Sequence, residues 1–385
     1  MFHHESLTMS EPTPFPTVGK LAQETGATWP GFELAAQGTI NAEDTLRQVL
    51  YGEHGGRRLS SDASLVLFGS FARREMLDGS DVDWSLLIDG VVNSSHADQA
   101  KVIGTLIADK LKSPGSSGTF GNLVFSHEMV HRIGGGADSN ANLTRRMLML
   151  LESRAFSLSK ADSSSRVWEN VLKNILQRYF EEDVHFSPAG ERKVPRFLLN
   201  DLTRYWRTIC VDYAAKHQEQ DGKKWAIRNA KLRFSRKLLY ASGLAFCLSC
   251  QLAPPEKHHK DLFGTTLDES AGPFIEHAMA FASTPALEYL AAFISTFVTA
   301  DEKRHLIATR VFGAYNEWLR LLGDKSKREE LESLSHADAE KSKLFMAVRE
   351  HGAEFAKGLE LLFFNRNRDE EQDNISKLSL EYIGF

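Results

Sequence analysis

The strongest constraint on the fold of this chain is a change of hydrophobic pattern near residue 142. Before that point, short apolar runs typical of strands alternate with helical spacing, whereas long amphipathic segments follow one another after it. Strand patterns almost vanish in this second part. The order predicts an α+β domain followed by an all-helical domain, and a length of 385 residues is sufficient for two domains.

The expected elements of the first part follow from local patterns. We expect an irregular N-terminal arm over residues 1–40, because four prolines interrupt any periodic pattern there. Asn41 is predicted to cap the first helix of an α+β domain that extends over 41–142. Apolar runs predict strands at 65–68, 81–88 and 123–125, and helical spacing predicts a helix over 96–112.

The second predicted domain covers residues 143–385 and is expected to be a bundle of helices. Its apolar residues recur at helical spacing in segments separated by short polar stretches. The predicted helices are 143–156, 165–181, 195–217, 224–250, 286–297, 303–322 and 338–363.

Charge, cysteine content and hydropathy narrow the class of protein. The net charge is -5 and the pI is about 6.3, so a broad nucleic-acid surface is not expected. Three cysteines rule out a disulfide framework, and Cys247 and Cys250 are predicted to be buried thiols within a helix. No apolar run approaches the ~20 residues that a membrane span needs, and the N-terminus does not resemble a signal peptide. We therefore expect a cytoplasmic protein without a membrane partner.

Two polar pairs beside the predicted strands carry the clearest functional signal. Gly69 and Ser70 follow an apolar run, where the backbone N–H groups of a helix start and the serine hydroxyl can bind a phosphate. After the spacer 71–80, Asp81 and Asp83 stand at i and i+2, which places both carboxylates on one face of a strand. Two such carboxylates bind Mg²⁺ together with the phosphates of a substrate. The spacing thus predicts metal-assisted nucleotidyl transfer.

This pattern resembles the polymerase-β-like nucleotidyltransferase superfamily. The match consists of the apolar–Gly-Ser element, the spacer and the Asp-apolar-Asp pair, and Phe71-Ala72-Arg73 and Gly79-Ser80 sharpen it. The resemblance implies a small mixed sheet, an NTP substrate (ATP or UTP) and a two-metal site that binds Mg²⁺ or Mn²⁺ through the two aspartates. The nucleotide-binding residues that it implies in this domain are Gly69, Ser70, Arg73 and Ser80.

A third carboxylate normally comes from a later strand in this superfamily. The candidates are Glu128, Asp138 and Glu152, and Glu128 is assigned as the third metal ligand, which helps to deprotonate the acceptor. Ser126-His127-Glu128 with Arg132, and Leu151-Glu152-Ser153-Arg154, further resemble segments of the uridylyltransferase that modifies PII signal proteins and of its stand-alone relatives. In that alignment Val124 occupies the position of the family's strand acid. A site of two acids and an impaired enzyme therefore stay open.

An overlapping motif gives an alternative chemistry. The run His127-Glu128-Met129-Val130-His131 fits H-E-x-x-H, which on a helix binds zinc through two histidines while the glutamate activates water. A helix here would have to begin directly after a strand, and the third ligand of one zinc protease type would fall on Ala137, which cannot bind a metal. A zinc metallohydrolase that uses His127, Glu128 and His131 remains the secondary interpretation.

The helical domain contains two basic stripes at helical spacing. An arginine-rich helix over 196–207 can line a cleft and bind a triphosphate or a base edge, and a second basic run over 223–237 can do the same. In the superfamily, a Lys or Arg from the first helices of this domain often grips the incoming triphosphate. The alternative is that both stripes are solvated faces of amphipathic helices. The predicted nucleotide-binding residues are Arg196, Asn200, Arg204, Lys224, Arg228 and Lys231.

Together these observations predict a Mg-dependent nucleotidyltransferase that transfers NMP from an NTP to an acceptor hydroxyl and releases pyrophosphate. The acceptor is expected to be a protein, by resemblance to the PII uridylyltransferase, or a small molecule. Two further alternatives remain open. One is a non-catalytic nucleotide-binding regulator with a degenerate site, and the other is a second-messenger synthase whose acceptor is a second nucleotide.

Overall fold

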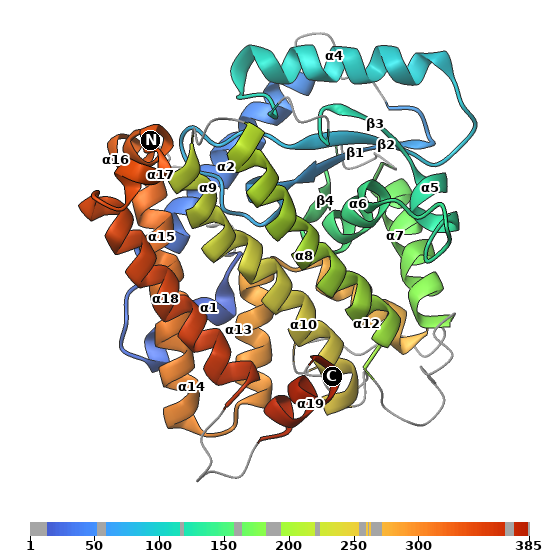
Figure 1. Ribbon diagram of the computed structural model, residues 1–385. Helices are drawn as coiled ribbons and strands as arrows, with labels where there is room; N and C mark the ends of the chain where they lie inside the picture. The colour runs from blue at the N-terminus through green and yellow to red at the C-terminus, as the bar shows by residue number, and fades with distance from the viewer. Residues whose placement is uncertain are drawn as a thin grey trace, which may run out of the picture.

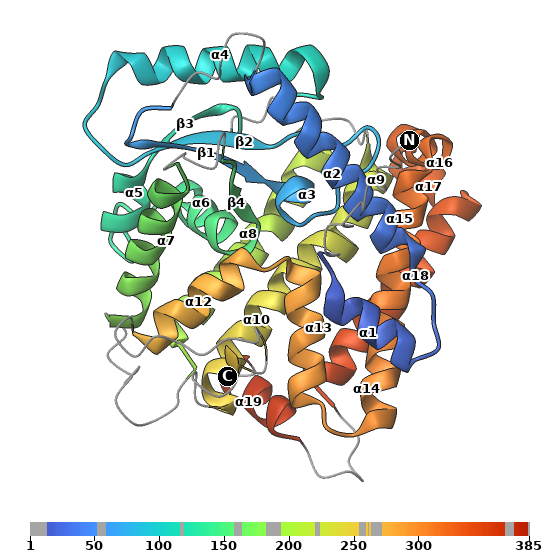
Figure 2. The same ribbon diagram turned by 180° about the vertical axis from the view of Figure 1, so that it is seen from behind.

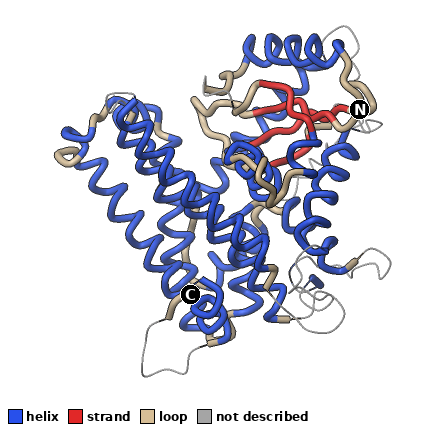
Figure 3. Tube along the Cα trace, turned by 45° about the vertical axis from the view of Figure 1, so that its right-hand side comes forward, coloured by secondary structure: helices blue, strands red, loops and turns tan. Residues whose placement is uncertain are grey.

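The computed structural model describes residues 14–51, 59–115, 119–157, 164–181, 194–219, 224–253, 259–260, 262, 272–365 and 373–383. Within this part of the chain, a small sheet lies at one end of the molecule and helices form the remainder (Figure 1). Figure 3 shows the strands together in one compact layer, with helices on both sides. No helix in the described part of the chain is both long enough and apolar enough to span a membrane.

The sheet has four strands in the order β3-β2-β1-β4. Strand β1 (Ala63–Phe68) is antiparallel to both neighbours, β2 (Trp84–Ile88) and β4 (Ser153–Ala155). Strand β3 (Asn122–Phe125) is parallel to β2 and forms one edge. The predicted class, a small mixed sheet followed by a helical region, is confirmed.

The helices account for the remaining elements, and most agree with the expected segments. The predicted helix over 224–250 is one continuous run in which a π-helical turn, η1, separates two α-helices. The helical elements are α1 (Pro16–Glu24), α2 (Pro30–Tyr51), α3 (Gly69–Ala72), α4 (Ser94–Lys110), α5 (Ser126–His131), α6 (Asn140–Leu151), α7 (Ser164–Glu181), α8 (Arg196–Glu219), α9 (Trp225–Lys231), η1 (Leu232–Arg236), α10 (Lys237–Leu252), α12 (Pro273–Ser283), α13 (Ala286–Phe297), α14 (Asp301–Ala308), η2 (Thr309–Gly313), α15 (Ala314–Gly323), α16 (Lys325–Ser333), α17 (His336–Ala339), α18 (Lys343–Phe363) and α19 (Asn374–Ile383).

The two faces of the sheet pack against different helices. Leu65 and Leu67 of β1 join a core that includes Ile103 of α4, whereas Val66 and Phe68 point into the large core of the helical region. Figure 1 shows α4 along one side of the sheet and helices α6, α7 and α8 on the other. Because both faces are covered, every residue of β1 is buried, and all of them except Ser64 are apolar.

The N-terminal part differs from the irregular arm expected over residues 1–40. Residues 1–13 lie outside the described residues, but α1 and α2 are regular helices, and α2 runs through Asn41 instead of beginning there. Prolines open both helices, at Pro16 and Pro30, where the first turn needs no N–H donor. Figure 2 shows α1 against α13 and α2 reaching from α15 to the sheet.

Strand β4 lies beyond the domain boundary predicted near residue 142. The predicted helix over 143–156 ends at Leu151, and Ser153 then pairs with Phe68 at the end of β1. The N-terminal sheet therefore includes residues of the segment assigned to the helical domain, and the domain division stays a prediction. Cys247 and Cys250 are buried free thiols in α10.

Candidate active site

The Gly-Ser pair and the acid pair meet because β1 and β2 are antiparallel neighbours. Leu67 pairs with Trp84, so the end of β1 lies beside the start of β2. The N–H of Phe68 donates a hydrogen bond to the carbonyl of Asp83 at 2.8 Å. Gly69 has a φ of +63°, and a Cβ added there would lie 2.8 Å from Oδ2 of Asp83. Only glycine accommodates both this backbone conformation and this close approach of the carboxylate.

The acid pair lies in an environment that is partly shielded from water. Desolvation, followed by the neighbouring carboxylate of Asp81, raises the pKa of Asp83 to about 7, while Arg236 and Lys231 act in the opposite direction. Carboxylate oxygens are the ligands that a hard divalent cation such as Mg²⁺ prefers. Among the described residues, no group of three His, Cys, Asp or Glu side chains could hold a metal ion. Asp81 and Asp83 offer two carboxylates at this place, a donor set that Mg²⁺ can share with the phosphates of a substrate.

A cleft opens beside the acid pair, between the end of the sheet and the helices. One wall comes from the turn after β1 and from the loop before β2, and the other comes from α9, η1, α15 and α16. The residues that line it are Gly69, Ser70, Arg73, Glu75, Leu77, Ser80, Asp81, Asp83, Lys231, Ser235, Arg236, Trp318, Leu319, Leu322 and Arg328. The structure thus brings seven sequence-predicted residues into one cleft, namely Gly69, Ser70, Arg73, Ser80, Asp81, Asp83 and Lys231.

The helical wall supplies the positive charges of the cleft. Lys231 ends α9 and Arg236 ends the π-helical turn η1, and both interact electrostatically with Asp83. Desolvation lowers the pKa of Lys231, whereas Asp81 raises it. The wider turn of a π-helix places Lys231, Ser235 and Arg236 together at the cleft. Two cations opposite two carboxylates form a suitable setting for a bound metal–triphosphate.

Arg73 lines the cleft but already has two carboxylate partners. Its guanidinium donates to Glu75 at 2.9 Å and to Glu152 on the other side. Burial disfavours the charge, yet Glu75 and Glu152 raise the pKa of Arg73 above its ordinary value. Tyr315 donates a hydrogen bond to Glu75 at 3.0 Å and so links the group to α15. Arg73 is thus part of a buried ion cluster, and its charge is largely neutralised within the protein.

Glu128 does not join the acid pair. It follows the far end of β3, since Asn122 pairs with Ser85 near the start of β2 and Phe125 pairs with Ile88 at its end. Its carboxylate is 3.8 Å from both Arg132 and Arg145 and is half exposed. Asp138 binds Arg146 through both oxygens, at 2.8 and 2.7 Å. Because the strand direction takes β3 away from Asp83, the predicted third ligand is not where the metal site requires it.

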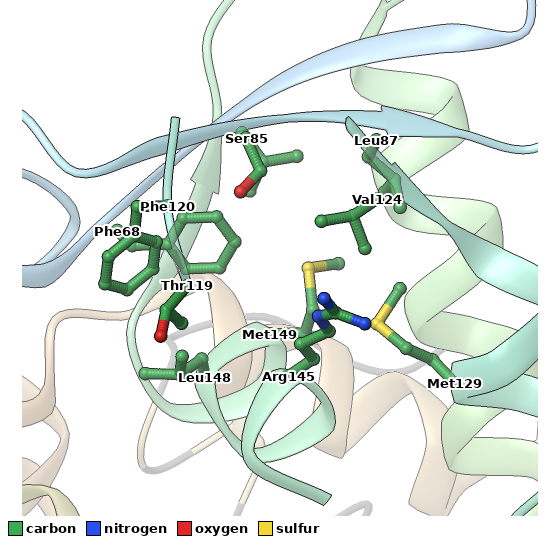
Figure 4. Close-up of a pocket in the computed structure, with 11 residues that line it drawn as sticks. Phe68, Ser85, Leu87, Thr119, Phe120, Val124, Met129, Arg145, Leu148 and Met149 are labelled. Atoms are coloured by element: carbon green, nitrogen blue, oxygen red, sulfur yellow. The ribbon is translucent and has the colours of Figure 1, made fainter. Parts of the chain in front are cut away.

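The position of the missing strand acid is apolar. Val124 lies on β3 beside Leu87 and lines a small pocket. Figure 4 shows Val124 opposite Met149 and Met129 in this pocket, with Phe68 and Phe120 at its other end. Arg145 is the charged side chain of this lining, so the pocket adds no carboxylate to the site.

The H-E-x-x-H motif does lie on a helix. Helix α5 begins directly after β3, which removes the objection that a helix would not start there. The rings of His127 and His131 lie 5.0 Å apart between centroids. The described residues around them provide no third His, Cys, Asp or Glu for a metal ion.

The remaining predicted nucleotide ligands lie outside the cleft lining. Arg196 and Asn200 line a separate groove with α19, where the Arg196 guanidinium lies 5.1 Å from the ring centroid of Tyr382. Arg204 donates to Asp201 at 2.8 Å. In the second basic run, Lys231 lines the cleft. Arg228 lies one turn before it on α9 and Lys224 directly precedes α9, and neither is part of that lining. Helical periodicity identified a basic face, but it did not indicate which turn of that face meets the sheet.

Sequence reasoning missed functional candidates that come from distant segments. Arg236 belongs to the basic run, yet its contact with Glu152 at 2.6 Å depends on the π-helical turn. Arg328 of α16 has no motif around it, and Glu75 is an isolated acid in the sequence. The Leu-Glu-Ser-Arg segment was the one local signal that pointed to Glu152.

Comparison with known proteins identifies one region of the chain. Residues 56–111 match a family model described as a nucleotidyltransferase domain. This region contains β1, the Gly69–Ser70 turn, the acid pair, β2 and α4. Neither the curated proteins nor the solved structures gave a match to the chain. The match supports the polymerase-β-like superfamily for this region, and with it an NTP substrate and NMP transfer as the general class of reaction.

Proposed function

We propose that the protein is a nucleotidyltransferase that uses Mg²⁺ or Mn²⁺ to transfer NMP from an NTP to an acceptor hydroxyl. The observation that carries the proposal is the approach of Asp83 to Gly69, whose Cβ position would lie 2.8 Å from Oδ2. This contact places a carboxylate that can bind a metal directly beside the turn that can bind a phosphate. The nucleotidyltransferase match covers both residues.

Each wall of the cleft has a separate role in the proposed reaction. The turn at Gly69 and Ser70 binds the β- and γ-phosphates, and Asp81 and Asp83 hold the divalent cations. Lys231 and Arg236 face the same space from the helices and offset the negative charge of the triphosphate. When bound, the cations polarise the phosphates and neutralise the charge that develops on them.

The bond changes are those of an in-line displacement. The acceptor oxygen forms a bond to the α-phosphorus, the bond from that phosphorus to the bridging oxygen breaks, and pyrophosphate leaves with the electron pair. The proton of the hydroxyl is released to solvent. The described residues supply two acids instead of three, so catalysis here relies on positioning and charge neutralisation by this pair and the facing cations.

The acceptor is proposed to be a protein or a small molecule. The resemblance of the segments around Glu128 and Glu152 to the PII uridylyltransferase supports a protein hydroxyl. Incubation with each α-labelled NTP, Mg²⁺ or Mn²⁺ and a cell lysate tests this assignment. We expect label on a protein band or a small molecule, and label in a dinucleotide or oligonucleotide would instead support a second-messenger synthase.

A second candidate function is a nucleotide-binding regulator without catalysis. The observation that favours it is the apolar pocket around Val124, where the superfamily places a third acid. The two functions differ in whether pyrophosphate is released. NTP binding with pyrophosphate release in the presence of acceptor supports the enzyme, and tight binding without release under the same conditions supports the regulator.

A further inference from the structure

We propose that Arg328 is a positioning residue that holds the loop carrying Asp81 at a fixed distance from the cationic wall of the cleft. The inference rests on the proposed function, because it concerns how the two walls are brought together around one metal–nucleotide. Arg328 lies on α16, in the C-terminal half of the chain, and 249 residues separate it from Gly79.

Arg328 contacts the backbone of the loop that carries Asp81, which is called the acid loop below. Its Nη1 donates to the carbonyl of Asp78 and its Nη2 to the carbonyl of Gly79, both at 2.7 Å. Its Nε is 3.2 Å from Oε1 of Glu332, one turn further along α16. The side chain is 10 % exposed, so these bonds are largely shielded from competing water. The planar fork of the guanidinium suits two adjacent acceptors, which a lysine cannot engage in the same way.

The acceptors of these bonds belong to a tight turn just before the acid pair. The N–H of Ser80 donates to the carbonyl of Leu77 at 3.0 Å, and the N–H of Leu77 donates to the hydroxyl of Ser80 at 3.2 Å. Gly79 has a φ of +73°, and a Cβ there would touch the Arg328 guanidinium at 3.5 Å. Asp81 follows the turn directly, so a displacement of the turn displaces its carboxylate.

The far side of Asp81 is anchored within the sheet domain. The N–H of Val82 donates to the carbonyl of Lys112 at 2.9 Å, and Phe68 binds the carbonyl of Asp83. These bonds fix the acids relative to β1, but they do not relate them to the helices. Arg328 connects the acid loop to helix α16 directly.

Among the described residues, the cleft-lining Arg236 and Glu75 also form hydrogen bonds that link the helices to the sheet side, and both bonds lie away from the acid loop. Arg236 reaches Glu152 at 2.6 Å, and Tyr315 reaches Glu75 at 3.0 Å. Within the described part of the chain, Arg328 is the cleft-lining cation that donates hydrogen bonds to the backbone of the acid loop. It therefore sets the width of the cleft beside Asp81, where the carboxylates and Lys231 must reach the same bound metal–triphosphate. A misplacement of about 1 Å at such a site is enough to reduce its activity about 100-fold.

Loss of Arg328 is expected to change this geometry more than the fold. Asp78 and Gly79 are exposed, so their carbonyls can bind water when the guanidinium is removed. Helix α16 keeps its buried Leu331 and its N-cap, where Asp324 accepts a hydrogen bond from the N–H of Lys327 at 3.2 Å.

The test compares R328Q, R328K and a matched control, R320Q, in the full-length protein. Arg320 is an exposed arginine on α15 that pairs with Glu317, so R320Q removes the same charge outside the cleft. Hydrogen exchange of residues 77–84 is measured without nucleotide, and binding of Mn²⁺–ATP and Mn²⁺–UTP is measured by titration. We expect faster exchange of 77–84 in R328Q, together with a dissociation constant for the preferred nucleotide raised about 10-fold, because a smaller fraction of molecules holds the binding geometry.

We expect R328K to retain part of the nucleotide affinity, because a lysine can form one of the two hydrogen bonds to the acid loop. R320Q is expected to match the wild type. Unchanged exchange of 77–84 in R328Q, or equal effects of R328Q and R320Q, would overturn the inference. An unfolding midpoint of R328Q that falls with no change in exchange local to 77–84 would also overturn it, since that result shows a merely structural role. A wild-type protein that binds neither Mn²⁺–nucleotide contradicts the proposed function instead, and the exchange data alone then decide whether Arg328 holds the loop.

Discussion

Arg236 donates a hydrogen bond through Nη1 to Oε1 of Glu152 at 2.6 Å, and this contact joins the π-helical turn η1 to the residue just before β4. Glu152 also binds Arg73, so one buried carboxylate holds the two arginines at the base of the cleft. The attraction of Glu152 raises the pKa of Arg236. The sheet and the helices are therefore joined by an ion pair at the point where the candidate site is formed.

The first prediction concerns the stability that Glu152 provides. Its side chain is 1 % exposed, and E152Q leaves the buried Arg73 and the adjacent Arg236 without a shared counter-charge. We expect E152Q to lower the free energy of unfolding by about 3 kcal/mol, as measured by chemical denaturation. The matched control is E128Q, since Glu128 is half exposed and its ion pairs are 3.8 Å long, so its change should stay within about 0.5 kcal/mol. Equal effects of the two substitutions would contradict the role given to Glu152.

The second prediction concerns Gly69. An alanine there must adopt a φ of +63° and place its Cβ 2.8 Å from the Asp83 carboxylate. We expect G69A to destabilise the protein by about 1–2 kcal/mol and to displace Asp83, with a loss of Mn²⁺ binding as the readout. Gly136 provides the control, because a Cβ added there meets nothing within 4 Å. Normal Mn²⁺ affinity in G69A would show that the contact does not place the acid.

The third prediction concerns the pH dependence of stability in metal-free buffer. The pKa of Asp83 is about 7 in the folded protein and about 3.9 for an aspartate in an unfolded chain. Between these values the folded state holds a proton that the unfolded state has lost. Stability therefore falls as the pH rises through this window, by up to about 1.4 kcal/mol per pH unit. D83N lacks this group, so its stability relative to the wild type should increase from pH ~5 to pH ~8 in EDTA.

The comparison for this third prediction is D109N, which changes an exposed aspartate of α4. Its stability relative to the wild type should be the same at both pH values. A D83N difference that does not change with pH would refute the raised pKa. Mg²⁺ added at the higher pH should stabilise the wild type but not D83N, because a ligand that binds only the folded state raises its stability.

The fourth prediction separates the acids by role. D81N should lose metal-dependent nucleotide binding, whereas E128Q should keep the affinity of the wild type, because β3 carries Glu128 away from the cleft. Titration with Mn²⁺–NTP measures both. A loss in E128Q comparable to that in D81N would restore Glu128 as a metal ligand and would require a rearranged β3.

The part of the site that the sequence predicted is the part built from local patterns. Gly69 and Ser70 directly follow β1, and Asp81 and Asp83 stand just before β2. Because these two strands are antiparallel neighbours, a turn and an i, i+2 pair were enough to place the four residues together. The position of Glu128 relative to the acid pair could not be predicted, because the direction of a strand relative to its neighbour cannot be seen in a short apolar run. Since β3 is parallel to β2, its far end lies away from Asp83.

The fold shows the same division between local and distant information. Most helices have a periodic apolar pattern that can be seen in the sequence. Helices α1 and α2 begin with prolines, and in the sequence alone these prolines indicate irregular structure. Strand β4 is Ser-Arg-Ala, which has no apolar alternation, and it exists because it pairs with β1. Arg328 and Tyr315 reach the site through tertiary contacts across more than half of the chain, and no local spacing encodes such contacts.

The central claim is that the Gly69–Asp83 site transfers NMP, and parallel incubations with α-labelled and γ-labelled NTP test it most directly. The wild type and D81N are incubated with Mg²⁺ and an acceptor-containing lysate, and the acceptor and pyrophosphate fractions are counted. The account predicts α-label on the acceptor, γ-label in pyrophosphate, and loss of both in D81N. Label from the γ-position on the acceptor, or α-label transfer that persists unchanged in D81N, would contradict it.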